Sequence, residues 1–134
     1  MKRHTVILIS TLLFLIVPAI AGDKQPAKTV LDGNDPVLLT QGTTEKGSDT
    51  HALEHEGYRY LFASQANLDT FKKTPATYQI QMQGACARMA KEGAPAGSGK
   101  PHLYTVHEQK LYLFGSPECV EVFKANPAEF LPQK

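Results

Sequence analysis

Residues 55–78 read HEGYRYLFASQANLDTFKKTPATY, and residues 107–130 read HEQKLYLFGSPECVEVFKANPAEF. At a fixed offset of 52, ten of these 24 positions are identical. Self-similarity at a constant spacing indicates that one supersecondary unit occurs twice in the chain. Because two copies are too few for a solenoid, the sequence predicts a single pseudo-symmetric domain in which each unit covers the apolar face of the other.

Each unit is predicted to contain a strand followed by a short helix. Residues 58–62 alternate in the period of a strand and are rich in aromatic side chains. Ser64 and Ser116 stand where a helix N-cap is expected. Phe71 and Phe123 belong to apolar stripes at helical spacing. The expected fold class is therefore α+β, a small single domain of two similar units, each a β-hairpin and a short helix.

The segments outside the repeat complete this prediction. Residues 51–54 are expected to pair with 58–62, and residues 102–106 to pair in the same way with 110–114. Residues 31–39 look like a turn that leads into a short strand. Residues 80–91 are predicted to form a helix, with Gly84 as its weak point.

The first 21 residues have the pattern of a secretory signal. Lys2 and Arg3 form a basic start, residues 5–20 form an apolar run, and residues 19–21 (AIA) form a small-x-small cleavage site. An uncleaved membrane anchor is the alternative, although the run is barely long enough. The expected organisation is a signal peptide at 1–21, a flexible lead-in at 22–30 and one domain at 31–134, placed in the periplasm or secreted.

Charge and hydropathy restrict the partners. The whole chain has 14 Lys+Arg and 13 Asp+Glu; the signal segment holds two of the basic residues and none of the acidic ones, so 12 and 13 remain, a formal charge of −1. Without a basic patch, nucleic acid is not an expected partner. No segment after residue 21 is long and apolar enough to insert stably in a membrane. A metal ion or a partner protein is expected instead.

Five short stretches resemble a known family, the YHS domain. Residues 33–37 (GNDPV) are similar to its Gly-Tyr-Asp-Pro-Val opening, and residues 60–64 (YLFAS) and 75–78 (PATY) to its central motif. Residues 84–87 (GACA) resemble its Gly-Tyr-Cys-Ala signature, and residues 110–113 (KLYL) its Gly-Lys-Leu-Tyr-Leu segment. The resemblance spans residues 31–130 and implies a small α+β domain, often exported in bacteria, while implying little about activity.

The second unit also resembles the related heavy-metal-associated domains of the TRASH type, which handle metals through cysteines. Those domains carry Phe-Cys-Ser followed shortly by another Cys. In this chain Gly115 stands at the first Cys position and Cys119 at the second, while Ala63 and Asn67 stand at both positions of the first unit. The resemblance implies a metal site that keeps Cys119.

Cys86 and Cys119 are the only cysteines, and three interpretations stay open. After export a disulfide is expected, which would close a 34-residue loop and stabilise the fold by about 3–4 kcal/mol. Alternatively both are metal ligands: Cys119 falls at the N3 position of its helix, where the dipole favours thiolate. Met82 and Met89 share a face with Cys86 if residues 80–91 are helical, and such soft ligands suit Cu(I). In the third interpretation the two are separate buried thiols.

His102 begins the strand after a Gly-rich loop and could approach either cysteine, as a metal ligand or as the base of a thiol enzyme. No Gly-x-Ser-x-Gly, His-Glu-x-x-His or phosphate-binding Gly loop is present, so a non-enzymatic role is favoured. The sequence therefore predicts an exported protein that binds a soft or heavy-metal ion such as copper, through Cys86, Cys119, Met89 and His102. The alternatives are a disulfide-stabilised interaction module without metal and, third, a thiol enzyme with a Cys–His pair.

Overall fold

The computed structural model describes residues 25–133, so the predicted signal segment lies outside the described residues. The strands are β1 (Lys28–Thr29), β2 (Ser48–His55), β3 (Tyr58–Phe62), β4 (Lys100–His107) and β5 (Lys110–Phe114). The α-helices are α1 (Pro36–Thr40), α2 (Gln65–Lys73), α3 (Pro75–Tyr78), α4 (Pro117–Ala125) and α5 (Pro127–Phe130). Three 3-10 turns complete the fold, η1 (Leu31–Gly33), η2 (Gln81–Gly84) and η3 (Ala90–Glu92).

The fold class is confirmed as a small α+β domain. One sheet has the strand order β1-β3-β2, with β1 parallel and β2 antiparallel to β3. The other is the antiparallel hairpin β4–β5. Within the described part of the chain, none of the helices combines the length and the apolar character needed to cross a membrane.

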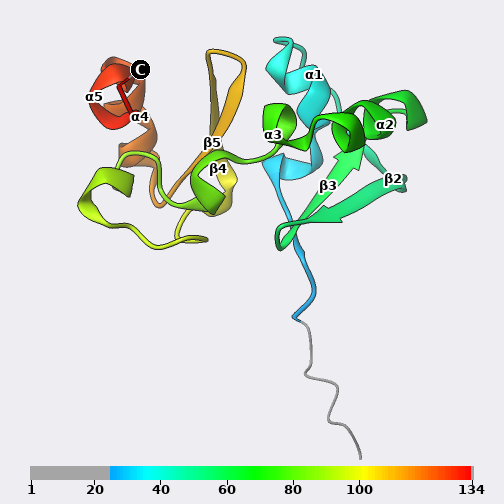
Figure 1. Cartoon of the computed structure of the whole chain (residues 1–134), viewed down its shortest axis with the longest axis horizontal. Helices are drawn as coiled ribbons and strands as arrows, with labels where there is room; N and C mark the ends of the chain where they lie inside the picture. The colour runs from blue at the N-terminus through cyan, green and yellow to red at the C-terminus, as the bar shows by residue number, and fades with distance from the viewer. Residues whose placement is uncertain (1–24, 134) are drawn as a thin grey trace, which may run out of the picture.

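The sequence repeat is a structural repeat. The series β2-β3-α2-α3 recurs as β4-β5-α4-α5, and every boundary in the second series lies 52 residues after its counterpart. Both hairpins shift register at the same point, before Ala52 in one unit and before Tyr104 in the other. Figure 1 shows α1 and α2 on one side of the molecule and α4 and α5 on the other, with β5 between them.

Serine caps start the main helix of each unit, as the sequence predicts. Ser64 and Ser116 have the same backbone conformation (φ −150°, ψ 160°). The Ser64 hydroxyl accepts a hydrogen bond from Asn67 N, and the Ser116 hydroxyl accepts one from Cys119 N. Because an N-cap oxygen satisfies an amide that has no partner within the helix, each cap fixes where its helix begins.

Two apolar cores lie on the two faces of β5. Leu111 and Leu113 belong to the first core, together with Phe71, whereas Phe114 belongs to the second core, together with Phe123. All four strand residues from Leu111 to Phe114 are buried. The second unit therefore contributes directly to the core of the first, in agreement with the expectation that the units cover each other.

The repeat also extends further toward the N-terminus than sequence identity indicates. Residues 31–33 all have positive φ, as do residues 82–84, at an offset of 51 rather than 52. Gly33 O accepts a hydrogen bond from Gly47 N at 2.8 Å, and Gly84 O accepts one from Gly99 N at 2.8 Å. Both units therefore open with the same left-handed turn, which is an uncommon conformation for residues other than glycine.

Two predicted elements are wrong. Residues 31–39 form η1 and then α1 rather than a strand, because the Asp35 carboxylate caps the helix and Pro36 suits its first position. Residues 80–91 are not a helix but the two separate turns η2 and η3, because the backbone is left-handed at Met82, Gln83 and Gly84. The proposed helical face with positions 82, 86 and 89 therefore does not exist.

The predicted flexible lead-in, residues 22–30, differs from the structure at its C-terminal end. Lys28 and Thr29 pair with β3 as strand β1, and Val30 N donates a hydrogen bond to Arg59 O. Val30 is buried in the first core. The ordered domain therefore includes residues 28–30.

Candidate functional site

Asp35 is the centre of a hydrogen-bond network in the first unit. Its side chain is completely buried, and Oδ1 accepts hydrogen bonds from Val37 N at 2.8 Å and Leu38 N at 3.1 Å. Oδ2 accepts from Ala63 N and from Asn67 Nδ2, both at 2.8 Å. One carboxylate thus links the start of α1, the end of β3 and the first turn of α2.

Cys86 takes the place of Asp35 in the second unit. Both residues lie two positions after the glycine that ends the left-handed turn, Gly33 in one unit and Gly84 in the other. The repeat also places Gly115 at the position of Ala63, and Cys119 at that of Asn67. A Cβ on Gly115 would lie 3.8 Å from Cys86 Sγ, so the cysteine faces the end of β5 as Asp35 faces the end of β3.

The two cysteines lie in the second core. Cys86 is 4% exposed, and Cys119 is half-buried and packs against the same cluster. This cluster consists of Cys86, Ala87, Tyr112, Phe114, Val120, Phe123 and Phe130. Cys119 is at position N3 of α4, as predicted, and its Sγ accepts a hydrogen bond from the Ser116 hydroxyl at 3.3 Å. Both predicted thiols therefore lie in the second core, as the repeat and the packing show.

The cysteines are nevertheless free thiols and are not at disulfide distance. The structure gives a physical reason for this. The atoms through which Asp35 and Asn67 meet, Oδ2 and Nδ2, are each two bonds from Cβ, whereas the Sγ of a cysteine is bonded directly to Cβ. Two cysteines on the same backbone positions therefore leave a gap wider than an S–S bond of about 2.05 Å.

The predicted thioether ligand Met89 also packs against the second core, as does Met82. The Arg88 guanidinium lies beside Met89 Sδ. Met82 lines a small cleft beside Tyr112 and Leu131, and neither cysteine lines that cleft. Both methionines therefore pack against the same core as the two thiols.

His102, the other predicted ligand, is not brought to the cysteines. It is exposed at the irregular start of β4, next to Leu103, which packs against the second core. No hydrogen bond joins His102 to Cys86 or Cys119 in residues 25–133, so the Cys–His pair of the thiol-enzyme alternative is not assembled. Over the same residues no group of three or more His, Cys, Asp or Glu side chains could hold a metal ion.

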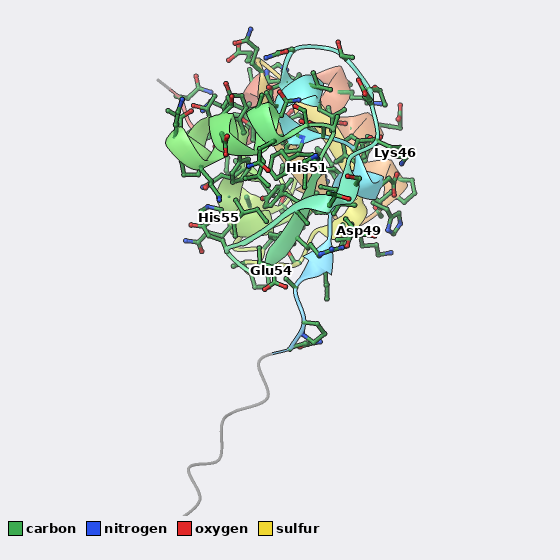
Figure 2. The ribbon with its side chains drawn as sticks, turned by 90° about the vertical axis from the view of Figure 1, so that its right-hand side faces the viewer. Lys46, Asp49, His51, Glu54 and His55 are labelled. Atoms are coloured by element: carbon green, nitrogen blue, oxygen red, sulfur yellow. The ribbon has the colours of Figure 1, made fainter. Side chains whose placement is uncertain are left out.

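The last residue of the first strand in each hairpin, His55 in β2 and His107 in β4, packs against the core phenylalanine of its unit. His55 bonds to Gln79 Oε1 at 2.7 Å and packs edge-on against Phe71, with ring centroids 5.5 Å apart. Its counterpart His107 packs in the same way against Phe123, at 5.9 Å. Figure 2 shows His51 and His55 at separate positions along β2, as expected for strand residues four apart. His55 and His107 therefore have equivalent packing roles at the edges of the two cores.

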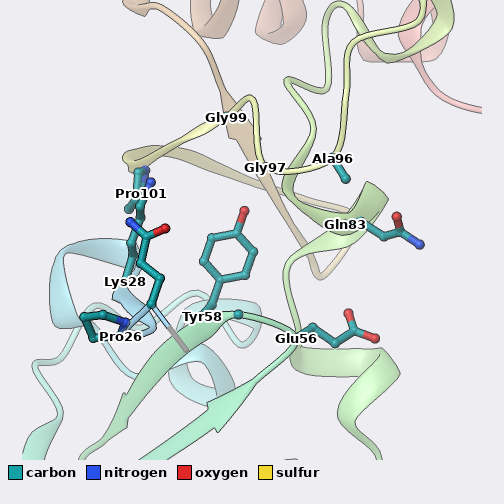
Figure 3. A pocket seen from close by; sticks show the side chains of 11 residues that line it. Pro26, Lys28, Glu56, Tyr58, Gln83, Ala96, Gly97, Gly99 and Pro101 are labelled. Carbon is teal, nitrogen blue, oxygen red and sulfur yellow. The ribbon is translucent and has the colours of Figure 1, made fainter. Parts of the chain in front are cut away.

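A cleft of about 580 Å³ lies elsewhere, between the β2–β3 turn and the Gly-rich loop before β4. Figure 3 shows Tyr58 standing in this cleft with its hydroxyl toward the loop at Gly97 and Gly99. Burial raises the pKa of Tyr58, which favours the neutral phenol. The other lining residues include Lys28 and Glu56, of opposite charge, and neither cysteine lines the cleft.

Comparison with known proteins gives no further assignment. No protein-family model matches the chain, and neither the curated proteins nor the solved structures contain a significant match. The arrangement of the two thiols and of the residues around them is therefore the basis for inferring a function.

Proposed function

We propose that this chain is an exported, non-enzymatic protein of the YHS type that binds a thiophilic metal ion through Cys86 and Cys119. The observation that carries the proposal is the equivalence of the two cysteines with Asp35 and Asn67, a pair in direct contact in the first unit. The repeat thus supplies a backbone arrangement that points two side chains at each other. In the second unit both of these side chains are free thiols.

Cys119 lies in the first turn of α4, and its Sγ accepts a hydrogen bond from the Ser116 hydroxyl at 3.3 Å. A thiol coordinates a metal ion as the thiolate, so metal binding should release protons.

Titration of the reduced protein tests this proposal. Wild type is expected to bind about one equivalent of a thiophilic ion, supplied as Cu(I) or Zn(II), with proton release. Cys86→Ser and Cys119→Ser should each weaken binding by at least about tenfold, because each removes one of the two thiolates. Affinity is measured by competition with a chelator, and proton release by calorimetry in buffers of different ionisation enthalpy.

His102→Ala is the matched control, because it removes a potential ligand that lies outside the second core. Its affinity should equal that of wild type, and circular dichroism should show that all three variants are folded. If both serine variants bind the ion as tightly as wild type, the cysteines are not its ligands and the proposal is refuted.

The proposed export gives a separate prediction. The apolar run and the AIA site at residues 19–21 predict that Gly22 is the mature N-terminus. Mass spectrometry of the protein from a periplasmic or secreted fraction should find a chain that begins at Gly22. A full-length chain that retains Met1 in the membrane fraction would show an uncleaved anchor instead.

A further inference from the structure

We propose that the cleft beside Tyr58 binds a short peptide with free ends, whose ammonium group pairs with Glu56 and whose carboxylate pairs with Lys28. The cleft measures about 580 Å³, which is within the range of about 300–1,000 Å³ that is usual for pockets that bind small molecules. Neither cysteine lines it, so this site is separate from the proposed metal site.

The Tyr58 hydroxyl is a polar group that the fold itself does not use. Tyr58 is only 8% exposed, and its hydroxyl points toward the Gly-rich loop on the other side of the cleft (Figure 3). Among residues 25–133 the tyrosine hydroxyls with a hydrogen-bond partner are those of Tyr60 and Tyr104, not that of Tyr58. Because polar groups of buried side chains normally have a partner, this hydroxyl is available to a ligand in the cleft.

The repeat indicates that the architecture of a unit does not require this tyrosine. The residue 52 positions after Tyr58 is Lys110, which is exposed at the start of β5. Tyr60, in contrast, corresponds to Tyr112, and both of these tyrosines are buried. The second unit therefore folds without an aromatic ring at the position of Tyr58, which favours a role for Tyr58 that is specific to the cleft.

The charges that line the cleft indicate the class of ligand. Lys28 and Glu56 are both exposed, and Figure 3 shows them on opposite sides of Tyr58. Neither side chain forms an ion pair with another residue of the described part of the chain. A molecule with an ammonium group at one end and a carboxylate at the other can pair with both charges. Burial raises the pKa of Tyr58, so the phenol between them stays neutral and can both donate to and accept from a peptide group.

The experiment titrates the full chain with trialanine and follows the amide resonances by NMR. Trialanine should shift the resonances of residues 56–58 and 97–99, with one peptide bound per chain and a Kd below about 1 mM. N-acetyl-trialanine and trialanine amide each lack one end charge, so each should bind at least about fivefold more weakly. Glu56→Gln should lose the preference for trialanine over the acetylated form, and Lys28→Gln should lose the preference over the amide, because each variant removes the partner of that end.

Two tyrosine variants on the same strand separate binding from stability. Tyr58→Phe should weaken trialanine binding at least about fivefold and leave the denaturant midpoint unchanged, because its hydroxyl has no partner within residues 25–133. Tyr60→Phe is the matched control. It loses the hydrogen bond from Ile80 N, so its midpoint should fall while its affinity for trialanine stays that of wild type.

Three results would overturn the peptide site. They are the absence of shifts around the cleft, equal binding of trialanine and both blocked forms, and wild-type affinity in Tyr58→Phe. Tighter binding of glucose than of trialanine at the same resonances would also overturn it, because an uncharged sugar would then be the better ligand. The metal titration does not depend on these results, since Tyr58→Phe leaves both cysteines in place.

Discussion

Phe71→Ala and Phe123→Ala are each expected to lower the free energy of unfolding by about 3–5 kcal/mol. Both rings are completely buried at equivalent positions of the two units. Phe71 lies 4.9 Å from the Tyr60 ring centroid, and Phe123 lies 5.0 Å from that of Phe114. Removing either ring leaves a cavity and loses its aromatic contacts. Denaturant unfolding of both variants, followed by circular dichroism, measures the two losses.

Val122→Ala provides a matched control on the same helix as Phe123. Val122 is 37% exposed, so its truncation should change the free energy of unfolding by less than about 0.5 kcal/mol. The two phenylalanine variants should also resemble each other, because the units have the same architecture. A loss below about 1 kcal/mol at either position would show that its unit is not packed around that ring.

The elements of the repeat could be predicted from the sequence because their signals are local. Residues 58–62 alternate between buried and half-buried positions, as their pattern indicates. Ser64 and Ser116 cap helices that begin at the next residue. In these segments local propensity and tertiary packing favour the same structure, which is the condition under which sequence patterns are reliable.

The predicted helix at residues 80–91 failed because tertiary contacts decide that segment. Gly84 has φ +72°, and a Cβ there would lie 1.8 Å from the Tyr58 hydroxyl. Gly84 O also accepts the hydrogen bond from Gly99 N. These partners are distant in the sequence, so helical periodicity, which considers only neighbouring residues, could not include them.

The candidate site was predicted in part. Cys86 and Cys119 do lie in one core and Met89 packs against it, whereas His102 does not join them. The equivalence of Cys86 with Asp35 was missed because the offset changes from 52 to 51 before the hairpin. A signal was present, since GND at 33–35 and GAC at 84–86 both precede a Gly-containing loop and a hairpin. Allowing a one-residue shift between the copies would have aligned them.

Asp35→Ala is expected to be as severe as loss of a core ring, with a decrease of about 3–5 kcal/mol in the free energy of unfolding. The substitution removes the acceptor of four hydrogen bonds. Their donors are the amides of Val37, Leu38 and Ala63 and the Asn67 side chain. Buried donors without an acceptor carry a desolvation penalty, and α1 also loses its cap. Denaturant unfolding measures the loss.

Asp35→Asn and Asp69→Ala complete this test. The asparagine keeps the shape and one acceptor oxygen, so its loss should be smaller than that of alanine, although its amide nitrogen then faces other donors. Asp69 is exposed, and within residues 25–133 its carboxylate bonds only to Gln65 one turn earlier, so its replacement should cost less than about 0.5 kcal/mol. If Asp35→Ala is no more costly than Asp69→Ala, the carboxylate does not hold the first unit together. Asp35 would then not join the segment after the left-handed turn to the helix that follows the hairpin. In that case Asp35 would give no reason to expect Cys86, at the same position of the second unit, to face Cys119.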